Sequence, residues 1–67
     1  MNNFFRIVGI NEQETIINLS KMTSVQRNSK SITFKFEEDN SVTSIFAHEE
    51  HCKDTFDRIF NYLNRND

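Results

Sequence analysis

Apolar residues in the last third of the chain recur at the spacing of an α-helix. They lie at i, i+4, i+7, i+8 and i+11, and such positions form one stripe, about 100° wide, along a helix. The five residues are Cys52, Phe56, Ile59, Phe60 and Leu63. Glu49 and Glu50 complement the positive amino end of a helix at this place. The spacing therefore predicts a helix that begins near Ala47 or His48 and packs this stripe against the core.

Upstream of this helix, apolar and polar residues alternate with the period of two that is typical of half-buried strands. Five such segments, separated by short polar turns, cover residues 4–10, 15–19, 22–26, 32–37 and 42–46. Gly9, near the end of the first, indicates a bulge or a close backbone approach. The pattern predicts an α+β fold, an antiparallel β-meander of four to five strands with one C-terminal α-helix packed on one face.

The register of the last two strands decides which of their side chains are exposed. A two-residue turn at positions 39 and 40 pairs Phe36 with Thr43 and Phe34 with Ile45. The residues then expected beneath the helix are Ile32, Phe34, Phe36 and Ile45. A slip of one residue exchanges the two faces of a strand, so a different register would reverse this assignment.

In the predicted register, Val42 and Phe46 point away from the helix and share the outer side with Phe4. A small monomer rarely exposes several large apolar side chains together. These three residues are therefore our candidate self-association surface. The alternative is that another register places them in the core.

A second stripe on the predicted helix flanks the apolar one and consists of His51, Thr55, Arg58 and Tyr62. Tyrosine and arginine are common at the centres of interfaces, and arginine binds phosphate or carboxylate through two donors. We expect this stripe to contact a partner or a ligand. The alternative is a solvated flank in which Tyr62 covers the edge of the core.

The 67 residues form one domain, with no proline, a single glycine and no linker. A chain this short buries only about 60% of the surface that its unfolded form exposes, so association with other copies is a common source of stability. A lone cysteine forms no internal disulfide, and Cys52 suits a reduced core position. On a helix, His51 and Cys52 point about 100° apart. We therefore expect neither a metal site nor a cofactor.

The charges are nearly balanced, with 8 basic and 10 acidic residues and a net charge of −2. A protein that follows the phosphates of a nucleic acid is normally basic, so nucleic acid is an unexpected partner. No apolar run approaches the length of a membrane span, and the chain starts without the pattern of a signal peptide. We expect a cytoplasmic protein. The sequence also lacks a glycine-rich phosphate loop and a nucleophile elbow, so we expect no enzyme.

Residues 15–25 contain two predicted strands joined by Asn18-Leu19-Ser20, and a predicted hairpin follows at residues 32–46. This rhythm resembles the small β-meander accessory proteins of Gram-positive bacteria and their phages. The resemblance implies a non-enzymatic accessory role and assigns no site residue.

Together these observations predict a homo-oligomeric protein-interaction module with a regulatory or inhibitory accessory role, encoded by a low-GC bacterium or a phage. Two alternatives stay open. One is an oligomer that sequesters a small anionic ligand such as a signalling nucleotide, with Arg58 and Tyr62 as contacts. The other is a nucleic-acid-binding accessory protein.

Overall fold

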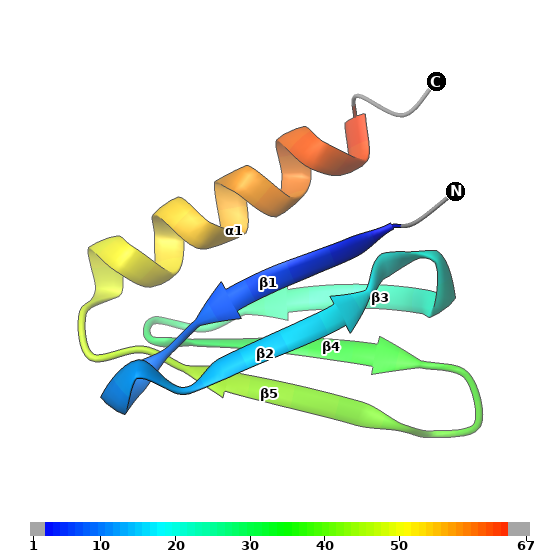
Figure 1. The fold of residues 1–67 in the computed structure, drawn as a ribbon, viewed down its shortest axis with the longest axis horizontal. Coiled ribbons are helices and arrows are strands. Elements are labelled where there is room, and N and C mark those ends of the chain that lie inside the picture. The colour runs from blue at the N-terminus through cyan, green and yellow to red at the C-terminus, as the bar shows by residue number, and fades with distance from the viewer. Residues whose placement is uncertain (1–2, 65–67) are drawn as a thin grey trace.

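The computed structural model describes residues 3–64 and has the predicted α+β class, with five antiparallel strands and one C-terminal helix (Figure 1). The elements are β1 (Phe4–Val8), η1 (Ile10–Glu12), β2 (Glu14–Asn18), η2 (Leu19–Lys21), β3 (Met22–Arg27), β4 (Ser31–Phe36), β5 (Ser41–Ile45) and α1 (Glu49–Asn64). The strands form two sheets. One, here called the ribbon, is the pair β1–β2, and the other, here called the sheet, has the order β3–β4–β5.

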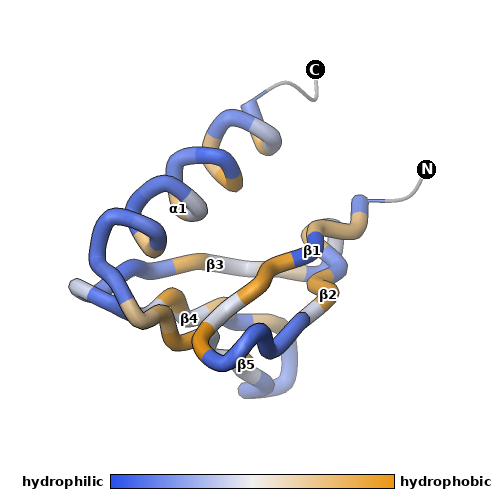
Figure 2. Tube along the Cα trace, turned by 60° about the vertical axis from the view of Figure 1, so that its left-hand side comes forward, coloured by the Kyte–Doolittle hydropathy of each residue, from blue (hydrophilic) through white to orange (hydrophobic). Residues whose placement is uncertain are grey.

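The core lies where the ribbon, the sheet and α1 meet. Each supplies buried side chains, such as Ile17 from the ribbon, Phe34 from the sheet and Ile59 from α1. Figure 2 shows hydrophobic residues concentrated in the strands, whereas hydrophilic and hydrophobic residues alternate around the turns of α1. The buried apolar residues within positions 3–64 are Ile7, Ile17, Leu19, Ile32, Phe34, Phe46, Cys52 and Ile59.

The register of β4 and β5 differs from the predicted one. Phe34 lies opposite Val42 of β5, whereas the predicted register placed it opposite Ile45. The predicted two-residue turn is wrong, because Phe36 N–H donates to the Asn40 carbonyl at 2.8 Å and the loop is centred on residue 38. Glu38 and Asp39 adopt left-handed φ angles of 65° and 63° within it.

This difference reverses the faces of β5, because an odd shift in register turns every side chain to the other side. Phe46, predicted to be outward, is buried with 1% of its surface exposed. Ile45, predicted to lie under the helix, is 55% exposed.

The helix begins at Glu49 and is rotated relative to the predicted stripe. Its buried residues are Cys52, Thr55 and Ile59, whereas Phe60 is 59% and Leu63 38% exposed. The cause is the ribbon, which lies beside α1 and draws Tyr62 inward: the rings of Tyr62 and Phe5 are 5.8 Å apart between centroids. The predicted stripe was based on a single sheet under the helix and did not take the ribbon into account.

The turn of the ribbon is tight and contacts the end of β5. Gln13 N–H donates to the Ile10 carbonyl at 3.2 Å, and Asn11 and Glu12 between them have φ angles of 59° and 58°. A Cβ atom on Gly9 would lie 2.7 Å from the carbonyl oxygen of Ile45. The close backbone approach predicted at Gly9 is therefore confirmed.

Candidate functional site

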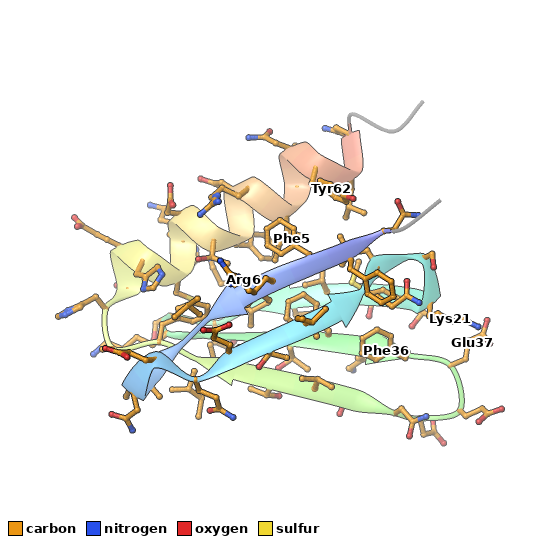
Figure 3. All side chains as sticks on the ribbon, in the orientation of Figure 1. Phe5, Arg6, Lys21, Phe36, Glu37 and Tyr62 are labelled. Carbon is orange, nitrogen blue, oxygen red and sulfur yellow. The ribbon has the colours of Figure 1, made fainter. Side chains whose placement is uncertain are left out.

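A hollow, here called the groove, lies between β2 and the β4–β5 hairpin and has a volume of about 460 Å³. Ile16, Asn18 and Lys21 lie on one side, and Phe36, Glu37 and Val42 lie on the other. Figure 3 shows Lys21 and Glu37 at the same end of the molecule, both reaching into solvent.

The groove exposes apolar surface between charged groups. Ile16 is 65% exposed, the highest exposure of any large apolar side chain among the described residues, and Val42 is 37% exposed. Glu37 and Glu38 line the groove on the hairpin side, opposite the single cation Lys21. The groove therefore combines an apolar surface with an acidic end.

Two of the strands that border the groove, β2 and β5, are edge strands. β2 pairs only with β1, and β5 pairs only with β4. Within residues 3–64, no backbone hydrogen bond joins β2 to β5. Each strand therefore keeps one row of backbone N–H and C=O groups free to pair with another extended segment.

The three residues predicted for self-association do not form one patch. Phe4 is 54% exposed and lies on the outer face of the ribbon, opposite Asn18 in the register. Val42 lines the groove, and Phe46 is in the core because the register of β5 differs. The prediction that Phe46 is a surface residue is wrong.

Sequence reasoning missed Ile16. Adjacent residues of a strand point to opposite faces, so only one of Ile16 and Ile17 can enter a core that lies on one side. Ile17 is buried and Ile16 is exposed. The pair of adjacent isoleucines was the available signal.

The helix stripe predicted to contact a partner or ligand lines a second region, here called the cleft, between α1 and β1. The residues that line one of its two hollows, of about 230 Å³, include Phe5, Arg6, His51, Thr55 and Arg58. The other, of about 350 Å³, is lined by Phe5, Arg58, Asn61 and Tyr62. Phe5 and Arg58 line both hollows, which therefore adjoin.

The four predicted contact residues thus lie together, but not all of them are exposed. Thr55 is 5% exposed and belongs to the buried face of α1, and Tyr62 is half-buried against Phe5. His51 stacks edge-on against Phe46, with ring centroids 5.0 Å apart. Arg58 remains exposed.

The charged groups that line the cleft are all basic. No aspartate or glutamate is among the described residues that line either hollow. Arg6 Nη1 lies 3.5 Å from Glu14 Oε1 on the outer face of the ribbon, and both side chains are largely exposed. No carboxylate of residues 3–64 lies within 4 Å of the Arg58 guanidinium. In a chain with a net charge of −2, this local excess of positive charge is distinctive.

Cys52 is an unactivated core thiol. It is fully buried, and burial raises the pKa of the Cys52 thiol above its usual value; Arg27 opposes this shift and Glu49 adds to it. A raised pKa keeps the thiol protonated and poorly nucleophilic at neutral pH. Among the described residues, no three or more His, Cys, Asp or Glu side chains are grouped so as to hold a metal ion.

None of the helical structure described for residues 3–64 is both long enough and apolar enough to span a membrane.

Comparison with known proteins gave no match: no family model fits the chain, and no curated protein and no solved structure is significantly similar to it. The resemblance to small β-meander accessory proteins therefore stays a prediction.

Proposed function

We propose that this chain is a non-enzymatic interaction domain with an accessory regulatory role, and that its groove binds an extended segment of a partner protein. The observation that carries the proposal is the position of Ile16. This side chain is 65% exposed at the border of a hollow of about 460 Å³, between two strands with unpaired edges.

An extended segment suits the groove better than a helix does. Edge strands bind peptides by adding a strand, in which backbone hydrogen bonds give affinity and alternate side chains give specificity. A strand that pairs with β2 or β5 directs every second side chain toward the same side. Such side chains would cover Ile16 and Val42, which line the groove from its two walls.

The charge of the groove selects a basic segment. Glu37 and Glu38 line it, Asp39 completes the turn beside them, and Lys21 is the one cation among its lining residues. Complementary charge favours the correct partner mainly through association rate and specificity. The expected partner segment therefore alternates apolar and basic residues.

A labelled hexapeptide of alternating valine and lysine tests this proposal by fluorescence anisotropy, with a valine–glutamate hexapeptide as the control. We expect the lysine peptide to bind and the glutamate peptide not to bind. Ile16→Thr should weaken binding about tenfold, the equivalent of about 1.4 kcal/mol. Ile45→Thr is the matched control, because Ile45 is also more than half exposed but lies outside the groove.

Binding that is lost equally in Ile16→Thr and Ile45→Thr, or equal binding of both peptides, would contradict the proposal. So would the absence of binding to either peptide at millimolar concentration. If the unliganded chain forms a dimer and Ile16→Thr disrupts it, a second copy of the chain, and not a partner peptide, covers the groove.

We also propose self-association through the outer face of the ribbon, where Phe4 remains an exposed candidate. The chain should sediment as a dimer at micromolar concentration, and Phe4→Asp should convert it to a monomer because an unpaired carboxylate in a desolvated interface is costly. A monomeric parent would contradict this part of the proposal.

A further inference from the structure

We propose that the cleft between α1 and β1 binds a mononucleotide, with its phosphate between Arg6 and Arg58 and its base against Phe5 and Tyr62. This site is separate from the groove, because the two regions share no lining residue. Nucleotide binding in the cleft is therefore independent of the proposed peptide binding in the groove.

Two arginines from different elements line one hollow of the cleft. Arg6 comes from β1 and Arg58 from α1, and both line the hollow of about 230 Å³ with no acidic residue among its lining side chains. Glu14 lies 3.5 Å from one nitrogen of Arg6, which leaves the other N–H donors of that guanidinium available. A guanidinium binds phosphate through two parallel hydrogen bonds, so two arginines on one hollow favour a phosphate group.

An aromatic pair lies next to the arginines. Phe5 and Tyr62 are half-buried, their ring centroids are 5.8 Å apart, and their planes are inclined at 60°. Both line the adjoining hollow of about 350 Å³, where the Asn61 amide supplies a donor and an acceptor. Aromatic side chains stack on any nucleobase, since every base has a π-face.

The arrangement of the two hollows determines the size of the ligand. Arg58 and Phe5 belong to both, so the proposed phosphate and aromatic regions are directly adjacent. Taken together, their volumes fall in the range of about 300–1,000 Å³ that is usual for small-molecule sites. One phosphate joined to one base through a ribose matches this adjacency, whereas inorganic phosphate or a free nucleoside would use only one of the hollows.

Titration of the full chain with AMP, GMP, CMP and UMP, followed by amide chemical shifts in NMR spectra, tests the proposal. We expect at least one mononucleotide to bind with a dissociation constant between about 1 µM and 1 mM, because the cleft is open to solvent. The shifted amides should belong to β1 and α1. Inorganic phosphate, ribose 5-phosphate and the matching nucleoside should each bind at least about tenfold more weakly.

Arg58→Gln should raise the dissociation constant of the mononucleotide at least about tenfold. Lys53→Gln is the matched control, since it removes the same charge from an exposed position of α1 that does not line the cleft. Arg58→Lys should recover only part of the affinity, because an ammonium group lacks the bidentate geometry of a guanidinium. Thermal melts of all three variants within a few degrees of the parent would show that the fold is retained.

Three results would overturn the inference. The first is the absence of amide shifts with every mononucleotide at millimolar concentration. The second is equal binding of inorganic phosphate and mononucleotides, which would exclude an aromatic contribution. The third is an equal loss of affinity in Lys53→Gln and Arg58→Gln, which would indicate a general charge effect. None of these results would affect peptide binding in the groove.

Discussion

The ribbon and the sheet each bury one face against the same core, but their outer faces differ. On the outer side of the sheet, the hydroxyls of Thr33 and Thr43 hydrogen-bond to each other at 3.1 Å, and Ile45 is the one large exposed apolar residue of β3–β5 on that side. On the outer side of the ribbon, Phe4 and Ile16 are 54% and 65% exposed. The sheet thus follows the usual division of an antiparallel sheet into an apolar and a polar face, and the ribbon does not.

This difference supports the proposal that the ribbon carries the interaction surface of the molecule. Scattered apolar residues on a surface need no explanation, but apolar side chains gathered on one small element mark an interaction site. Within the ribbon, Phe4 and Val8 flank the Arg6–Glu14 ion pair on β1, and Ile16 lies beside it on β2. The ribbon is therefore both a wall of the core and the most apolar exposed surface of the described strands.

The largest change in the free energy of unfolding is expected from a comparison of an inward-facing and an outward-facing residue at the end of β5. Phe46→Ala should lower the free energy of unfolding by about 3–5 kcal/mol, because it empties a fully buried position. A domain of this size has only about 3–5 kcal/mol from its core, so this variant should be largely unfolded at 25 °C. Ile45→Ala, next to it but 55% exposed, should cost at most about 1 kcal/mol. Urea titrations measure both, and similar costs would contradict the register of β5.

A comparison of a buried and an exposed residue of the ribbon should give a slightly smaller difference in the free energy of unfolding. Ile17→Ala should cost about 2–5 kcal/mol, whereas Ile16→Ala should change the free energy of unfolding by less than about 1 kcal/mol. The physical reason is burial, with 3% of Ile17 exposed against 65% of Ile16. Urea titrations again provide the measurement. A large cost for Ile16→Ala in a monomeric sample would show that this residue supports the fold and would weaken its assignment to partner binding.

The elements of this fold were predictable because periodicity reports them, but the register of β5 was not. Period-two and helical spacings located all five strands and α1, with α1 starting at Glu49, within two residues of the predicted Ala47 or His48. The turn between β4 and β5 contains no glycine, and its left-handed residues are Glu38 and Asp39. Left-handed turns are normally recognised by Asn-Gly or Asp-Gly, so this loop carried no readable signal.

The candidate sites were predictable only within single elements. The spacing of His51, Thr55, Arg58 and Tyr62 placed them on one side of a helix, and all four line the cleft. Their neighbours on β1 could not be identified, because helical spacing does not say which strand lies beside a helix. For the same reason, the five-residue apolar stripe was too wide: the ribbon covers α1 on the Tyr62 side, and Phe60 and Leu63 are left exposed.

The contact between the ribbon and the sheet can be tested at Gly9. Gly9→Ala should lower the free energy of unfolding by about 1–3 kcal/mol, the usual cost of forcing an extra group into a packed position. The added Cβ would lie 2.7 Å from the carbonyl oxygen of Ile45, a backbone atom that cannot rotate away. Thermal unfolding should show a loss of several degrees. An unchanged melting temperature would show that the ribbon is free to move away from β5.

The smallest expected effect is a gain in stability at the turn of the ribbon. Glu12 has a φ of 58°, a left-handed conformation that costs a residue with a side chain about 1–2 kcal/mol. Glycine adopts it without this cost, and Asn11 followed by glycine is a favoured two-residue hairpin turn. Glu12→Gly should therefore raise the free energy of unfolding by about 1 kcal/mol, which corresponds to a rise of about 4–8 °C in the melting temperature of a domain this small.

Glu37→Gly is the matched control for this last prediction. It removes the same charge from the loop of the other hairpin, but Glu37 is not among the described residues with positive φ. With no strain to relieve, glycine there only increases the freedom of the unfolded chain, so Glu37→Gly should leave stability unchanged or lower it by about 0.5–1 kcal/mol. Opposite signs for the two variants would locate the strain in the backbone at Glu12. A gain of equal size in both would instead assign the effect to the loss of a negative charge.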